Sequence, residues 1–140
     1  MISLKETNLY SEVIKEFIYP FGNIFIFNGF VVSEINQGQI INWNNQAKII
    51  VDDVSDFLGT NGEDIIYISN RINSYSVVAI DWLKFFNLQY SLKAYCIVSE
   101  NKIGILNSMI EKLFFTKRIK HFNNLFEAVN FVKKGVIEIA

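Results

Sequence analysis

The chain has 140 residues, of which 51% are hydrophobic and 19% charged, the size and composition of a single globular domain. A single cysteine excludes an internal disulfide and a cysteine-rich zinc site, and a single histidine excludes a multi-histidine metal centre, so we expect no metal and no cofactor. The net charge of −1 provides no basic footprint for nucleic acid.

The N-terminal sequence has no apolar core of a secretory signal. The longest uncharged stretch near it, residues 17–33, is interrupted by Pro20, Gly22 and Gly29 and is shorter than the roughly 20 apolar residues of a spanning helix. Cys96 lies in an apolar segment, which fits a reducing compartment. We therefore expect a cytoplasmic protein and do not favour a membrane partner.

The chain divides into an N-terminal segment, residues 1–21, and a single domain, residues 22–140. Within the N-terminal segment, residues 1–10 are expected to be loosely held, and residues 12–19 are a candidate additional strand.

The domain begins with a predicted β-hairpin. Residues 22–28 and 30–36 are rich in Phe, Ile and Val, and the Asn28-Gly29 pair between them readily adopts the positive φ of a tight turn. Apolar residues then recur at helical spacing over residues 43–58, and Gly59 follows in the position of a helix C-cap.

The rest of the domain repeats a strand and a helix three times. The expected strands are residues 64–69, 92–99 and 118–122, and the expected helices are residues 78–87, 102–115 and 124–134. Connections of this kind make neighbouring strands parallel. We therefore predict an α/β fold whose mixed sheet has about five strands, one antiparallel hairpin with the others parallel, and four helices on one or both faces.

This order of elements resembles the STAS domain, the fold of the SpoIIAA-like sporulation anti-sigma-factor antagonists. The end of the chain is especially similar, where the short strand at residues 119–122 is followed by a helix opening at residues 123–129. The sequence YISNRINSYS at residues 67–76, followed by DWLKFF at residues 81–86, resembles a group of small stand-alone bacterial STAS-like proteins. The similarity covers residues 22–133, and it is one of order and pattern.

The resemblance implies a non-enzymatic regulatory module that acts through protein contacts, in a partner-switching pathway with an anti-sigma-like kinase as one candidate partner. Antagonists of this family carry an Asp-Ser-Ser/Thr-Gly motif before the second helix, with a serine that is phosphorylated to switch binding. Here residues 69–76 lack that motif. Ser69, Ser74 and Ser76 are the candidates for a phospho-switch or contact loop, because a helix N-terminus favours a phosphate. The alternative is that Ser74 or Ser76 only caps the helix.

Arg71 follows a buried parallel strand at its carboxyl end, where open α/β sheets bind ligands. Together with Asn70 and Asn73 it is a candidate contact for an anion or another ligand. The alternative is a salt bridge to a helix carboxylate or a cap on loop carbonyls, since no glycine-rich phosphate loop accompanies it.

The remaining polar candidates do not indicate an enzyme. His121 would need a nucleophile and an orienting carboxylate to act as a general base, and the chain has no Gly-x-Ser-x-Gly motif. Cys96 is expected to be inert packing. Asp52 and Asp53 are adjacent on a helix and indicate a solvated acidic face. We therefore expect no catalytic residues.

Aromatic side chains are abundant, with 13 Phe, 6 Tyr and 2 Trp. Trp82, Phe85 and Phe86 cannot all point inward on one narrow helix face, and Phe114 and Phe115 pose the same difficulty. Such a surplus indicates a homodimer face or an apolar ligand pocket, or else only a thick core. Binding or sensing of a small apolar or anionic ligand is therefore the alternative function.

The near-zero net charge is a cancellation. Residues 1–70 carry a net charge of −6 and residues 71–140 a net charge of +5. Such a two-sided domain can steer a charged partner or pack head-to-tail with a copy of itself. Attachment to a membrane surface through Lys117, Arg118 and Lys120 beside Phe114 and Phe115 is a weaker option, because one small basic cluster binds little.

Overall fold

A six-stranded mixed sheet with the order β1-β2-β3-β5-β7-β8 forms the centre of the fold. The computed structural model describes residues 2–100 and 108–139. The strands are β1 (Lys15–Tyr19), β2 (Gly22–Ile26), β3 (Phe30–Ile35), β5 (Ile66–Asn70), β7 (Ala94–Val98) and β8 (Arg118–Phe122). β1, β2 and β3 are antiparallel neighbours, and β3, β5, β7 and β8 run parallel. The predicted α/β class and mixed sheet are confirmed, but the sheet has six strands rather than about five.

The sixth strand is the candidate strand of the N-terminal segment. β1 pairs with β2 along its whole length, with Lys15 opposite Ile26 and Tyr19 opposite Gly22. Phe17 and Tyr19 pack on one face of the sheet, whereas Ile18 on the other side is exposed. The mixed polarity of this segment is that of an edge strand, which is covered less completely than a central one.

The predicted hairpin is present between β2 and β3. Gly29 has φ +84°, a conformation that favours glycine because it has no Cβ. The Phe27 N–H donates to the Phe30 carbonyl at 2.9 Å, and the two phenyl rings stack. The Asn28-Gly29 turn therefore sets the register of the antiparallel pair.

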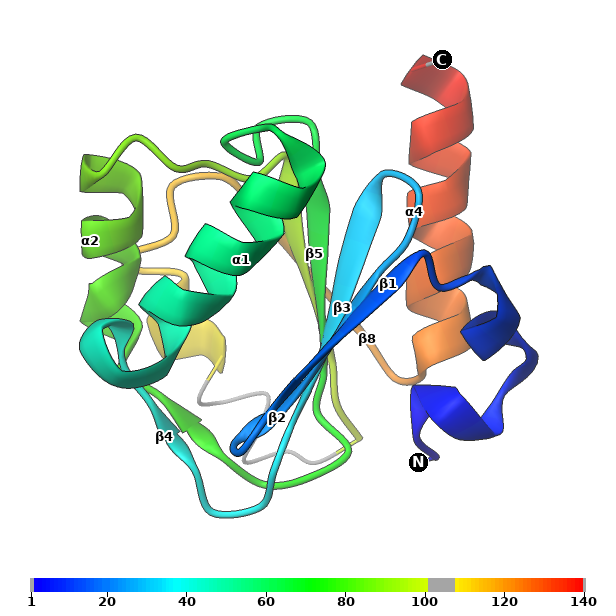
Figure 1. Ribbon diagram of the computed structural model, residues 1–140, viewed down its shortest axis with the longest axis horizontal. Coiled ribbons are helices and arrows are strands. Elements are labelled where there is room, and N and C mark those ends of the chain that lie inside the picture. Colours follow the sequence, from blue (N-terminus) through cyan, green and yellow to red (C-terminus); the bar gives the residue numbers. More distant parts are fainter. Residues whose placement is uncertain (1, 101–107, 140) are drawn as a thin grey trace.

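Helices cover both faces of the sheet (Figure 1), which the sequence had left open. α1 (Lys48–Leu58) and the short α2 (Trp82–Asn87) lie on one face, called here the α1 face. α4 (Leu125–Ile139) lies on the opposite face, the α4 face, beside the N-terminal turns η1 (Leu4–Glu6) and η2 (Asn8–Glu12). In residues 2–100 and 108–139, no helix is both long and apolar enough to cross a bilayer.

Several helix boundaries differ from the expected ones. A π-helical turn, η3 (Trp43–Ala47), precedes α1, and a 3-10 turn, η4 (Ala79–Asp81), precedes α2. α4 continues through Gly135 instead of ending before it. The expected helix at residues 102–115 lies partly outside the described residues, and of its described part residues 108–111 are helical. A small second sheet pairs β4 (Ile40–Ile41) with β6 (Ser76–Val77) in parallel.

The α4 face carries a tightly packed core. Asn124 caps α4, because its side-chain oxygen accepts a hydrogen bond from the Glu127 N–H at 2.9 Å. Over residues 125–134, whose burial is described, the side chains that α4 buries are the predicted ones, Leu125, Ala128, Val129 and Val132. They pack against alternate residues of the central strands, including Phe25, Val32, Ile68 and Cys96.

The N-terminal turns belong to this core, so the expectation of a loosely held terminus is wrong. Leu4 and Leu9 are buried among the α4-face side chains. The buried carboxylate of Glu34 accepts hydrogen bonds from the Ser3 hydroxyl and the Leu4 N–H, each at 2.7 Å. Two apolar anchors and one buried acceptor therefore hold a segment whose turns are too short to show a periodic pattern.

Candidate functional site

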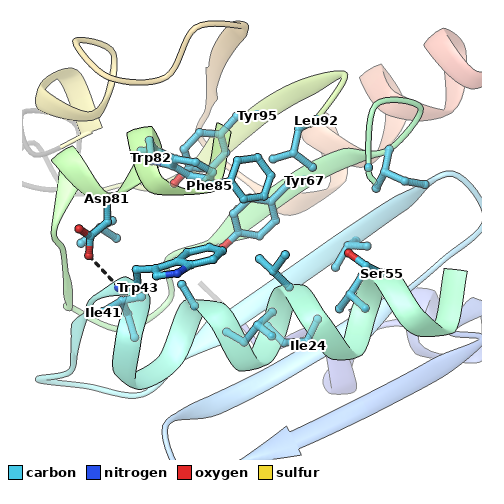
Figure 2. Close-up of a pocket in the computed structure, with 18 of the residues that line it drawn as sticks. Ile24, Ile41, Trp43, Ser55, Tyr67, Asp81, Trp82, Phe85, Leu92 and Tyr95 are labelled. Atoms are coloured by element: carbon cyan, nitrogen blue, oxygen red, sulfur yellow. Dashed lines mark hydrogen bonds between the residues drawn. The ribbon is translucent and has the colours of Figure 1, made fainter. Parts of the chain in front are cut away.

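The α1 face contains a partly open cavity of about 160 Å³ between α1 and the sheet. Figure 2 shows α1 along one side, α2 along the other and the strand residue Tyr67 between them. The wall is almost entirely apolar, and its main members are Ile24, Val31, Trp43, Ile50, Val51, Val54, Leu58, Tyr67, Trp82, Phe85, Leu92 and Tyr95. A dry apolar cavity of roughly 150 Å³ can hold a molecule of the size of benzene. The cavity therefore has the volume and the chemistry of a small apolar binding site.

α1 covers the sheet incompletely because this cavity lies under it. None of the residues Lys48–Leu58, all of which the structure describes, is fully buried. Ile50, Val54 and Leu58 reach the sheet-side cluster but remain only partly buried. On the other face of the sheet, α4 buries Ala128 and Val132 completely. The two faces thus differ in packing, although both helices have a regular apolar stripe.

The π-helical turn η3 brings Trp43 into the cavity wall. Asn42 caps this turn through its side-chain oxygen, which accepts from the Asn45 N–H at 2.9 Å. The Trp43 N–H donates to an Asp81 carboxylate oxygen at 2.7 Å, which ties the turn to the start of α2 (Figure 2). π-Helical turns of this kind are often found at functional sites.

A buried polar network closes one end of the cavity. One carboxylate oxygen of Glu111 accepts from the Trp82 indole N–H at 3.0 Å and from the Tyr95 hydroxyl at 2.9 Å. The other oxygen lies 2.6 Å from Arg71 Nη2. Arg71 also donates to the Tyr95 and Ser69 hydroxyls, at 2.8 and 3.1 Å. The Glu111 carboxylate lines the cavity with both oxygens hydrogen-bonded, so this end carries a neutralised pair of charges.

Tyr67 and Tyr95, which form the sheet side, or floor, of the cavity, are uncharged at neutral pH. Tyr67 and Tyr95 stack with ring centres 5.1 Å apart. Burial raises the pKa of both phenols well above the usual value. The Tyr67 hydroxyl shares a 2.6 Å hydrogen bond with Ser33. The floor therefore presents neutral aromatic faces to the cavity.

The three candidate anion contacts do not converge on one site. Arg71 is paired with Glu111, which is the salt bridge to a helical carboxylate of the alternative interpretation. The Asn70 amide donates to the Glu34 carboxylate at 2.9 Å, and its own side-chain oxygen is buried with no hydrogen-bond partner among residues 2–100 and 108–139. The Asn73 amide donates to the Ile35 carbonyl at 3.1 Å. Each of these side chains thus binds a different part of the protein.

The three candidate serines are also separated. Ser69 is fully buried and shares a 2.6 Å hydrogen bond with the Tyr75 hydroxyl. Ser74 and Ser76 are exposed, and Ser76 belongs to strand β6. Across residues 74–87, all described, the turn η4 and helix α2 begin without a side-chain cap. The capping interpretation is therefore wrong, because Ser76 lies in β6 and Ser74 lies before it, whereas η4 and α2 begin after that strand.

His121 has a neighbour that the sequence did not reveal. Its Nε2 is hydrogen-bonded to the hydroxyl of Ser108, a fully buried residue. Burial, together with the charges of Lys112 and Arg71, lowers the pKa of His121. In the described part of the chain, no cluster of three or more His, Cys, Asp or Glu side chains is arranged to hold a metal ion.

Sequence reasoning found part of the cavity through the aromatic surplus. Trp82 and Phe85 line it, whereas Phe86 packs on the buried Phe115 with ring centres 5.4 Å apart. Glu111 was missed, because a single carboxylate in an apolar helical pattern carries no signal of its partner.

No family model, curated protein or solved structure matches the chain.

Proposed function

We propose that this protein binds a small, uncharged, apolar molecule in the cavity under α1. The observation that carries the proposal is the hollow packing of this face, where an amphipathic helix of eleven residues has none that is fully buried. A ligand there would bury the partly exposed side chains of Ile50, Val54 and Leu58. Removing such apolar surface from water favours binding at roughly 25 cal/mol per Å².

The charges around the cavity favour an uncharged ligand over an anionic one. Arg71 donates to the Tyr95 hydroxyl at one end of the cavity, and Glu111 already neutralises it. Among the described residues, the cavity wall contains the carboxylate of Asp81 and no cationic side chain, which disfavours an anion. An ion placed among the remaining apolar side chains would lose its hydration without a partner of opposite charge.

The proposal is tested with toluene as an apolar probe and benzoate as its anionic counterpart. Both tryptophans of the chain, Trp43 and Trp82, line the cavity, so intrinsic fluorescence reports on this site. We expect saturable changes in fluorescence with toluene. The free energy of unfolding should also rise, by about 2.7 kcal/mol at a probe concentration of 100 times Kd. Benzoate should have no effect.

Two variants localise the probe. Val54→Phe places a larger side chain on the cavity wall and should abolish the toluene response. Ile14→Phe adds bulk at an exposed position outside the cavity and should leave the response unchanged. A wild-type protein that does not respond to toluene, or a response that survives Val54→Phe, would contradict the proposal.

A second candidate function is a STAS-like protein-interaction module whose contact loop is residues 72–76. The observation that favours it is the exposure of Ser74 and Ser76 within a loop that is held in place. The Gly38 N–H donates to the Ser74 carbonyl at 2.8 Å, and the Ser74 N–H donates to the Gln37 side chain at 2.9 Å. The loop thus presents two hydroxyls in a defined position.

The test of this candidate is capture of a partner with purified wild-type protein, followed by the same capture with Ser74→Asp and with Ser76→Asp. A phospho-switch predicts that at least one variant binds the captured partner more weakly, because each adds a negative charge to the contact loop. Ser11→Asp, at an exposed serine of η2, is the matched control. Equal binding by all variants would exclude the switch.

A further inference from the structure

We propose that the protein docks on an anionic lipid surface through a basic-apolar face formed by Met109, Ile110, Lys112, Leu113 and Lys117. The apolar part of this face is unusually open to solvent: Met109 and Ile110 are each 52% exposed, and Leu113 is 76% exposed. Side chains of this kind are among those most often buried in folded proteins. Three of them together within five residues mark a contact surface.

The same segment already contributes its inner side to the protein interior. Ser108, Glu111 and Phe115 are buried, so the segment is held in place from within. The burial of Phe115 also removes it from the apolar surface that the sequence had suggested beside the basic residues. The outward residues Met109, Ile110 and Leu113 form that surface instead, where an ordinary surface helix would carry polar side chains.

The charge on this face is positive. From residue 112 to residue 126 the sequence contains four cationic side chains and no carboxylate. Lys112, Lys117, Arg118 and Lys120 are all exposed. Arg118 and Lys120 lie on β8 but turn to the α4 face, where both contact the Phe131 ring of α4, so Lys112 and Lys117 supply the charge of the docking face. Exposed basic side chains beside apolar ones are the combination that binds anionic membranes.

The charge argues against a second copy as the occupant of this face. A two-fold pairing of this face would bring Lys112 and Lys117 close to the same lysines of the second copy, and like charges across an interface oppose association. Met109, Ile110 and Leu113 are exposed and do not line the cavity, whereas Glu111 of the same turn does. Exposed aliphatic side chains can insert among lipid tails, whereas binding to a folded acidic protein would require a complementary surface.

The structure supports membrane docking because exposed apolar side chains and exposed basic side chains lie in the same segment. A single basic cluster binds weakly, whereas a basic cluster joined to inserted apolar side chains binds stably. Docking by this face would also set the turn that carries Glu111, and hence one wall of the cavity, close to the bilayer. The inference does not require the cavity to be occupied, so the two proposals can fail separately.

The experiment is co-sedimentation of the full chain with lipid vesicles, either phosphatidylcholine alone or with about one third phosphatidylglycerol. We expect binding to the anionic vesicles that weakens as salt is raised, and little binding to the neutral ones. Leu113→Ser should weaken binding about tenfold through lost apolar burial. The double variant Lys112→Ala/Lys117→Ala should weaken it roughly 25-fold, at about fivefold for each lysine.

Matched controls lie at other places on the surface. Ile18→Ser removes an apolar side chain that is 72% exposed on β1, and Lys15→Ala/Lys48→Ala removes two exposed lysines. Both should bind as wild type does, and all variants should keep the wild-type circular dichroism spectrum because only exposed side chains change. No binding to anionic vesicles, or equal weakening by the controls, would overturn the proposal. So would capture by soluble polyglutamate without binding to vesicles, which would indicate an acidic protein partner.

Discussion

Arg71 and Glu111 form a buried ion pair that joins the end of β5 to the helical turn at residues 108–111. Arg71 Nη2 lies 2.6 Å from Glu111 Oε2, and the two side chains are only 6% and 2% exposed. The Trp82 indole and the Tyr95 hydroxyl bind the other carboxylate oxygen, so neither charge is left without partners. Burying two charges is favourable only with such complete hydrogen bonding.

Removing one charge of this pair should be strongly destabilising. Glu111→Gln keeps the shape of the side chain but leaves the Arg71 guanidinium buried without a counter-ion. We expect the free energy of unfolding to fall by about 3–5 kcal/mol, measured by urea denaturation.

The exposed pair of Glu12 and Lys133 provides the control. Their side chains are close to half exposed, so Glu12→Gln should cost less than about 1 kcal/mol. The double variant Arg71→Met/Glu111→Leu should recover much of the stability lost in Glu111→Gln. Equal effects of Glu111→Gln and Glu12→Gln would show that the buried pair is not structurally important.

The N-terminal anchor should be measurable in the same way. Leu4 is fully buried against the α4 face, so Leu4→Ala removes apolar contacts and leaves a cavity. We expect a loss of about 2–5 kcal/mol in the free energy of unfolding. Ile2→Ala, two residues away and mostly exposed, should change it by less than about 0.5 kcal/mol. A Leu4→Ala protein as stable as wild type would mean that the terminus does not contribute to the core.

His121 should make stability depend on pH. Its pKa in the folded protein is below the usual value of 6.5, so the unfolded chain binds the proton more readily. Stability from this residue is therefore complete above pH 6.5 and is lost as the pH falls through 6.5 towards the pKa of the folded state.

The measurement compares wild type with His121→Gln by urea denaturation at about pH 7.5 and about pH 5.5. Wild type should lose more stability on acidification than the variant, since other titrating groups are common to both. The same loss in both proteins would contradict the assignment. An NMR titration of the His121 ring should give the lowered pKa directly.

Cys96 should be unreactive in the folded protein. Burial raises the pKa of its thiol to about 11, and the side chain is inaccessible within β7. Because the thiolate is the reactive form, alkylation by iodoacetamide near neutral pH should be at least tenfold slower in native than in urea-unfolded protein. Similar rates in the two states would indicate frequent local opening of β7.

Much of the fold followed from short-range patterns. The Asn28-Gly29 turn, the helix that ends at Gly59, the strand β8 and the buried stripe of Leu125, Ala128, Val129 and Val132 were all predicted. Turn chemistry and apolar periodicity are properties of neighbouring residues, so they can be recognised without knowing what packs against them. The N-terminal turns escaped prediction because three to five residues do not complete a periodic pattern.

The candidate site was visible only in fragments. Arg71 stood out by its position after a strand, and Trp82 and Phe85 stood out as surplus aromatic residues. Their meaning depended on a carboxylate 40 residues beyond Arg71 in the sequence and on how closely α1 approaches the sheet. Packing distance and the choice of ion-pair partner arise between distant segments, so no local pattern reports them.

Some properties of this protein follow from its sequence alone, and others depend on how distant segments pack together. The sequence by itself determined the α/β order of elements, the absence of a disulfide framework and the separation of charge into a −6 half and a +5 half. Only the tertiary structure decided that helices cover both faces, that one face is hollow and that Met109, Ile110 and Leu113 point to solvent beside the lysines. The physical reason is that a sequence specifies which side chains are apolar or charged, whereas burial is decided by the surfaces that the folded chain brings together.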